Sequence, residues 1–69
     1  MPWEFKNKNF VDYYSKEDGE LEARITKMSD FNKISIHKDD ELVTSKKLAA
    51  KNSLELLFET GEKMLAEAK

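Results

Sequence analysis

Few residues of this chain could take part in covalent chemistry. His37 is the only histidine, and the chain has no cysteine. Nucleophilic catalysis needs a nucleophile, a base and a third group that orients the base. The serines fall at predicted turns or at the ends of predicted elements, and none belongs to a Gly-x-Ser-x-Gly motif. The composition therefore predicts a protein that is not an enzyme and has no catalytic residue.

The acidic run after His37 is the one segment that suggests a metal site. A calcium loop needs oxygen ligands at alternating positions over about twelve residues, with a central glycine. The segment 37–41 has neither feature. A zinc site needs more imidazole or thiolate ligands than this chain contains. We interpret 37–41 as a solvated turn, and we expect neither a metal nor another cofactor.

The solvent-facing side of the predicted sheet carries the residues best suited to binding. Aromatic rings beside basic residues can stack the bases of a single strand of nucleic acid. The same residue types are enriched at protein interfaces. A structural alternative is that the rings only cover the sheet, with Trp3 or Phe5 packed on them. The candidate binding residues are Phe10, Tyr14, Arg24, Lys33 and His37.

Length and charge limit the class of protein. The chain has 69 residues, of which 12 are Lys or Arg and 14 are Asp or Glu, so its net charge is −2. This length predicts one small domain over residues 1–69. A net charge near zero argues against a strongly electrostatic nucleic-acid binder, but it leaves room for a local basic patch. A core this small is often completed by oligomerisation, so we also consider a homodimer.

No segment of the sequence has the features of a signal peptide or of a membrane-spanning helix. The first residues lack the apolar stretch of a signal peptide, and the longest apolar stretches are far shorter than a bilayer span. Because cysteine is also absent, we expect a cytoplasmic protein.

Alternation of apolar and polar residues predicts a sheet over residues 9–45. A turn at Ser29-Asp30 places Ile25 opposite Ile34, and a turn at Asp39-Asp40 leads to a short strand over 41–44. In that last strand, Val43 would lie opposite Ile36.

Two registers are open for the first hairpin. A two-residue loop of Asp18-Gly19 would pair Asp12 with Ile25, a charged residue with an apolar one. A three-residue loop over 17–19 pairs Asp12 with Arg24 and aligns the apolar residues, so we predict this loop. It turns the following side chains toward the core: Val11, Tyr13, Leu21, Ala23, Ile25, Ile34 and Ile36.

The remainder of the chain, residues 45–69, is predicted to be a helix. Its start is open: Ser45 keeps the apolar stripe in phase and is preferred, whereas Asn52 with Glu55 resembles a capping box. In a helix from Ser45, the off-stripe residues Leu48 and Leu56 could form a dimer seam. Gly61 lies mid-stripe, where it allows a close approach of the sheet or of Trp3, or else breaks the helix. The stripe contains Ala50, Leu54, Leu57, Phe58, Gly61, Leu65 and Ala68.

Together these patterns predict an α+β fold. It is a three- or four-stranded antiparallel meander (βββα or ββββα) with one C-terminal helix packed on one face. The first functional hypothesis is a small regulatory module that binds another protein, such as an inhibitor or a phage-type accessory protein. The alternative is a binder of single-stranded nucleic acid that uses the exposed face of the sheet.

Overall fold

A computed structural model describes residues 3–69 of the chain. It shows an α+β fold with five antiparallel strands and one C-terminal helix, one strand more than the larger predicted number. The elements are β1 (Glu4–Lys8), β2 (Val11–Asp18), β3 (Leu21–Lys27), β4 (Phe31–Lys38), β5 (Glu41–Ala49) and α1 (Leu54–Ala68).

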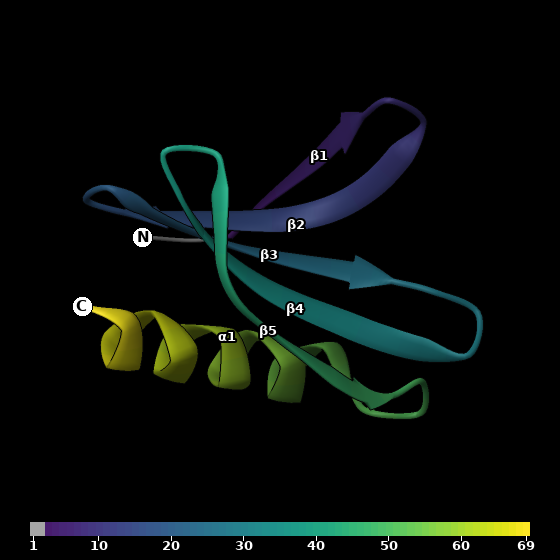
Figure 1. Cartoon of the computed structure of the whole chain (residues 1–69). Helices are drawn as coiled ribbons and strands as arrows, with labels where there is room; N and C mark the ends of the chain where they lie inside the picture. Colours follow the sequence, from purple (N-terminus) through teal and green to yellow (C-terminus); the bar gives the residue numbers. More distant parts are fainter. Residues whose placement is uncertain (1–2) are drawn as a thin grey trace.

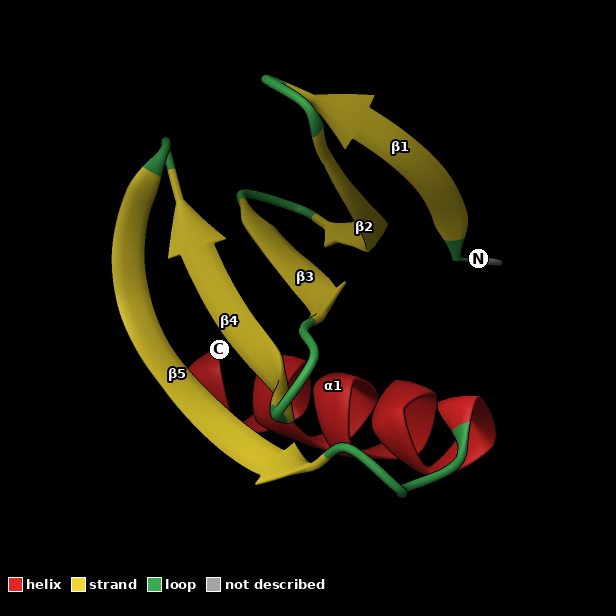
Figure 2. Cartoon of the chain, turned by 90° about the vertical axis from the view of Figure 1, so that its right-hand side faces the viewer, coloured by secondary structure: helices red, strands yellow, loops and turns green. Residues whose placement is uncertain are grey.

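The sheet is a meander in which each strand pairs with the next one along the chain, in the order β1-β2-β3-β4-β5 (Figure 1). It is strongly curved, and α1 lies across one side of it, against β3 and β4 (Figure 2). We call the side that α1 covers the inner face and the opposite side the outer face. Within the described part of the chain, no helix is long and apolar enough to cross a membrane.

The core lies between the inner face and α1. Alternate residues of β3 and β4 point into it, because successive side chains of a strand point to opposite faces. The helix contributes one stripe to it, and Leu57, Gly61 and Leu65 are its buried members. The buried apolar residues of this core are Leu21, Ala23, Ile25, Ile34, Ile36, Leu57 and Leu65.

The predicted pairing of β3 with β4 is confirmed. Ile25 lies opposite Ile34, and the turn between the strands closes with a hydrogen bond from the Met28 amide to the Phe31 carbonyl at 2.9 Å. The turn at Asp39-Asp40 is also present. Both aspartates have positive φ values, 51° and 66°, as the central residues of a type I′ turn do.

The predicted partner of Val43 is wrong. Thr44 lies opposite Ile36 and Leu42 lies opposite His37, so the register shifts between these pairs and leaves Val43 as the extra residue of a bulge. A bulge of this kind turns one additional side chain out of the ladder.

The predicted register of β2 is also wrong. Gly19 and Glu20 form a two-residue turn that pairs Asp18 with Leu21, and this register places Tyr14 opposite Ile25. Gly19 has a φ of 64°, which suits the first central position of a type II′ turn. As a result β2 is inverted relative to the prediction. Val11 and Tyr13 lie on the outer face, and Tyr14 lies on the inner face.

The helix explains why β2 adopts this register. Lys16 on the inner face forms an ion pair with Glu62 of α1, and Asp18 forms one with Lys69. The ring of Tyr14 meets Phe58 edge to face, with a centroid separation of 5.4 Å. These contacts with α1 and with Lys69 stabilise the polar and amphipathic side chains that β2 places on the inner face.

The preferred helix start is wrong, because β5 continues through Ala49. Helix α1 begins at Leu54, and its N-cap is Ser53, whose hydroxyl accepts a hydrogen bond from the Leu56 amide at 3.3 Å. The alternative start at Asn52 differs from this cap by one residue. Lysine, leucine and alanine favour helices, but pairing with β4 outweighs that preference over residues 45–49.

Gly61 allows the N-terminal tryptophan to contact the helix, as predicted. A Cβ atom at Gly61 would lie 2.7 Å from the Trp3 ring and 3.7 Å from the Ile25 side chain. The Trp3 ring stacks on Phe58, with centroids 5.0 Å apart. The glycine therefore creates the space in which Trp3 covers the core.

We predict that Gly61→Leu lowers the free energy of unfolding by about 1–3 kcal/mol, because the larger side chain would displace Trp3. Thermal and urea unfolding measure this change. The same substitution in a Trp3→Ala background serves as the control, and its cost should be smaller there. Equal costs in both backgrounds would show that Trp3 does not limit the space at Gly61.

Candidate functional site

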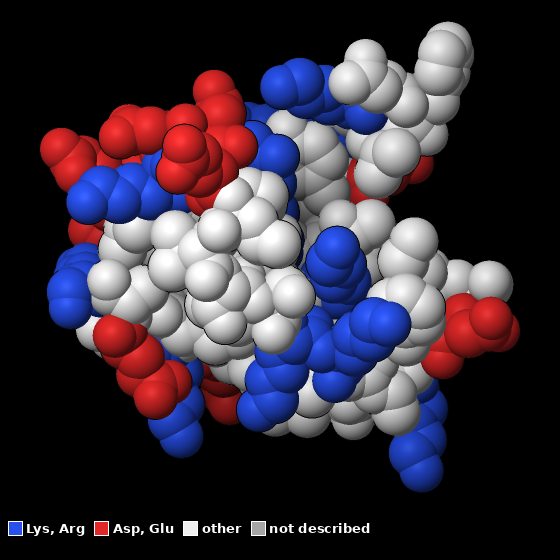
Figure 3. Space-filling model, in the orientation of Figure 1, with Lys and Arg blue, Asp and Glu red and all other residues white. Residues whose placement is uncertain are grey.

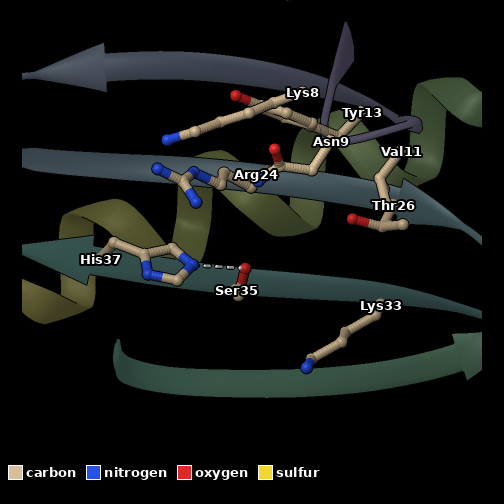
Figure 4. A pocket seen from close by; sticks show the side chains of 9 residues that line it. All are labelled: Lys8, Asn9, Val11, Tyr13, Arg24, Thr26, Lys33, Ser35 and His37. Atoms are coloured by element: carbon tan, nitrogen blue, oxygen red, sulfur yellow. Dashed lines mark hydrogen bonds between the residues drawn. The ribbon is translucent and has the colours of Figure 1, made fainter. Parts of the chain in front are cut away.

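The outer face of the sheet holds a hollow of about 360 Å³. Four strands contribute to it, and the residues come mainly from alternate positions that share this face. In Figure 4 the guanidinium of Arg24 lies between the side chains of Lys8 and His37. The residues around the hollow are Lys8, Asn9, Val11, Tyr13, Arg24, Thr26, Lys33, Ser35 and His37.

Polar residues are buried on this face even though no helix covers it. Ser15 and Ser35 are buried, and Tyr13 is only 9% exposed. Their neighbours on adjacent strands, together with the curvature of the sheet, remove them from solvent. Buried polar groups are normally hydrogen-bonded. The hydrogen bonds of these residues therefore hold the side chains around the hollow in fixed positions.

A hydrogen-bonded network holds Arg24 in place. The Arg24 Nε–H donates to Glu22 Oε1 at 2.6 Å, and the Ser15 hydroxyl donates to Glu22 Oε2 at 2.6 Å. The guanidinium lies over the Tyr13 ring, 5.4 Å from its centroid. Glu22 engages Nε, and Asp40 Oδ1 lies 3.9 Å from one terminal nitrogen, so the terminal nitrogens of Arg24 retain N–H groups that can donate to a ligand.

The same network changes the acidity of Glu22. Burial alone would raise the pKa of this carboxyl group, but hydrogen bonds from Ser15 and Arg24 and the positive charges of Arg24 and Lys6 outweigh it. The net effect holds the pKa of Glu22 below its ordinary value. Glu22 is thus ionised at neutral pH and fixes the Arg24 side chain as its counter-ion.

His37 lies at one side of the hollow as a neutral base. Burial lowers the pKa of its imidazole, as does the charge of Arg24 with a smaller effect from Lys33, whereas Glu22 and Asp40 oppose this shift. The Ser35 hydroxyl lies 3.0 Å from Nε2, and Nδ1 is buried without a hydrogen-bond partner among the described residues. A serine–histidine pair needs a group that orients the histidine before it resembles a catalytic triad.

The part of the chain that the structure describes contains no group of three or more His, Asp or Glu side chains placed to hold a metal ion.

Three of the five predicted binding residues, Arg24, Lys33 and His37, line the hollow. The predicted placement of Tyr14 on the outer face is wrong, because the register of β2 turns it to the inner face. Phe10 lies at the tip of the β1–β2 turn, is fully exposed, and has a φ of 65°. Its chain neighbours Asn9 and Val11 line the hollow, so the backbone of Phe10 adjoins the hollow, but its side chain does not line it.

The sequence alone did not identify several residues of the site. Lys8 was missed because the polar segment 6–9 gives no strand signal, and Tyr13 was assigned to the core. Ser15 and Glu22 could have been found from the sequence, because each is a polar residue at an alternate position of a predicted strand. In the observed pairing of β2 with β3 they are diagonal neighbours and form a hydrogen bond.

Charge is distributed unevenly over the molecule. Lys8 and Lys33 reach the hollow and form no ion pair with any described residue, and none of the nine residues around the hollow is acidic. Four glutamates lie instead on α1, on the other side of the sheet. The two lysines therefore make the hollow locally basic, although Arg24 is paired with Glu22 and the whole chain is slightly acidic.

No family model, no curated protein and no solved structure matches this chain. The function is therefore inferred from the geometry and charge of the hollow.

We predict that Glu22→Gln lowers the free energy of unfolding at pH 7 by about 1–3 kcal/mol, because it weakens the charged bonds to Ser15 and Arg24. A carboxylate whose pKa is lowered on folding stabilises the protein above its unfolded pKa, and this contribution is lost as the pH falls through the folded pKa. The difference between variant and wild type should hence shrink below about pH 4.5, the ordinary pKa of glutamate.

Urea unfolding across this pH range measures the effect of Glu22→Gln. Glu59→Gln is the control, because Glu59 is exposed on α1, and its cost should be near zero. A cost for Glu22→Gln that stays constant from neutral to acidic pH would contradict the role of the ionised carboxylate.

A second prediction tests the observed register. Tyr14→Ala removes a ring that packs against Phe58 and Phe5, so it should cost about 2–4 kcal/mol of stability. Phe10→Ala removes a fully exposed ring and should leave the melting temperature nearly unchanged. Equal losses for the two variants would be inconsistent with this placement of β2.

Proposed function

We propose that this chain is a non-enzymatic binding module, and that the hollow on the outer face of its sheet binds single-stranded nucleic acid. The observation that carries the proposal is the basic charge of the hollow, to which Lys8, Arg24 and Lys33 contribute from three strands. Phosphate groups of a nucleic acid backbone would pair with these cations. The hydroxyl groups around them add neutral hydrogen-bond donors.

Preorganisation of Arg24 supports this proposal. Glu22 and Tyr13 hold the guanidinium, so little side-chain freedom would be lost on binding a phosphate. Arginine also offers a planar set of donors that matches phosphate oxygens.

Phe10 supplies a ring that could stack on a base. It is fully exposed at the β1–β2 turn, where Asn9 and Phe10 both have the positive φ values of a type I′ turn. An aromatic ring beside a basic groove is the usual arrangement of single-strand binding surfaces. Tyr13 cannot serve this purpose, because it is buried under Arg24.

Binding to another protein, the first hypothesis from the sequence, becomes the second candidate for this face. The aromatic pair of Phe10 and Tyr14 was common to both hypotheses, and Tyr14 lies on the inner face, so the order of the two candidates rests on the charge of the hollow. An acidic protein segment could still engage the same cations. The experiment below separates the two ligands.

Fluorescence anisotropy with a labelled single-stranded oligonucleotide tests the proposal. Affinity should fall as salt rises, with a slope of about −2 in log K against log salt for three phosphate contacts. Lys8→Ala and Lys33→Ala should each reduce the size of this slope by about 0.7. Phe10→Ala should weaken binding about tenfold or more through lost stacking.

Lys27→Ala is the matched control, because Lys27 is an exposed lysine at the end of β3 outside the hollow, and it should leave the affinity and the slope unchanged. Absence of oligonucleotide binding at low salt would refute the proposal and favour the acidic protein segment. Equal effects of Lys27→Ala and Lys33→Ala would refute the location of the site.

A further inference from the structure

Strand β5 is an exposed edge of the sheet. Every residue from Glu41 to Lys47 is exposed, and only Leu48 is half-buried. Helix α1 covers β3 and β4 rather than β5. The outward backbone groups of such a strand have no partner within the sheet, which makes the strand a template for another strand.

The first half of β5 also exposes apolar side chains. Leu42 is 57% exposed and Val43 is 49% exposed. The bulge leaves Val43 unpaired in the ladder. Val43 and Thr44 line a second hollow with Met64 and Ala68 of α1, about 440 Å³ in volume, and Ser45, Lys46 and Glu67 complete its lining. Figure 3, in the orientation of Figure 1, shows an uncharged area in the middle of the face that carries β5 and α1, bordered by charged side chains.

Opposite charges lie at the two ends of this area. The turn before β5 and its first residue contribute Asp39, Asp40 and Glu41, and its second half contributes Lys46 and Lys47. In Figure 3 the acidic side chains gather at the upper left of the uncharged area and basic side chains gather toward the lower right. A surface with this arrangement is complementary to a copy of itself turned by 180°.

We infer that β5 and the uncharged area beside it bind a second copy of this chain, in a two-fold symmetric dimer that places the two β5 strands antiparallel. The Glu41 and Lys46 side chains share the inner face, because Glu41 pairs with Lys38 and Lys46 pairs with Ile34. The midpoint between Glu41 and Lys46 falls between Val43 and Thr44, and at about 3.3 Å per residue both residues lie about 8 Å from an axis at that point. Glu41 of each copy then meets Lys46 of the other copy, and the Val43 side chains lie beside the axis.

A second copy suits this surface better than an unrelated strand does. Self-pairing forms the same acidic-to-basic contact twice, and it buries Leu42 and Val43 of both copies at once. It also extends the small core of each chain, as expected for a domain of this size. The inference is independent of the proposed nucleic-acid site, because its measurement is the mass of the protein alone.

Sedimentation equilibrium of the full chain is the first test. The expected result is a concentration-dependent species of twice the 8.0 kDa chain mass. Val43→Asp should weaken association at least tenfold, with an unchanged circular dichroism spectrum, because Val43 is exposed and belongs to no core cluster. A wild-type chain that remains monomeric at millimolar concentration would overturn the inference.

Charge reversal is the more specific test. Glu41→Lys and Lys46→Glu should each weaken self-association at least tenfold, because each creates two like-charge contacts in the dimer. An equimolar mixture of the two variants should recover association as a heterodimer, since every contact then joins opposite charges.

Lys27→Glu is the control for net charge and should leave the dimer intact, because Lys27 lies at the end of β3. Failure of the mixture to associate more tightly than either variant alone would overturn the antiparallel arrangement of β5. An equal effect of Lys27→Glu would show that only net charge controls association, and it would overturn the inference as well.

Discussion

The register between β2 and β3 determines which side chains reach the outer face. The two-residue turn at Gly19-Glu20 fixes this register. A change of one residue would move the whole set of β2 side chains to the opposite face. With the observed turn, Tyr13 and Ser15 reach the hollow and Tyr14 reaches the helix. The core and the candidate site therefore depend on the same short turn.

The sequence predicted the elements whose stability comes from apolar pairing. The pairing of β3 with β4 was recognised because isoleucines oppose each other across a short turn. This pairing can be predicted from the two strands and their turn alone. The apolar stripe of α1 was recognised for the same reason. The register of β2 was not recognised, since its inner side chains are stabilised by Phe58 and Glu62 of the helix and by Lys69, which follows it. Cross-strand pairs alone do not contain that information.

The two edge strands were missed or shortened for a related reason. The residues of β1 are mostly polar, and its stability comes from pairing with β2 rather than from burial. The second half of β5 is composed of good helix formers, and only its partner strand makes it extended. Local propensity is a weak guide where a neighbouring strand supplies the backbone hydrogen bonds.

Within the candidate site, the predictable residues are those on the correctly paired strands. Arg24, Lys33 and His37 were placed on the exposed face because β3 and β4 alternate cleanly. Lys8 and Tyr13 required the register of β1 and β2, which the alternation does not specify. Burial of Ser15 on a face without a helix required the curvature of the sheet.

The meander order has a consequence for how the chain folds. Each strand pairs with its immediate neighbour in sequence, so every hairpin closes only a short loop, and chains of this kind fold quickly. The contact of Trp3 with Gly61 and Phe58 is different, because it joins the two ends of the chain. Its loop is the longest in the fold and depends on a formed helix, so it closes late. Trp3 is the only tryptophan, and its fluorescence therefore reports the final docking of the N-terminal segment rather than the formation of the sheet.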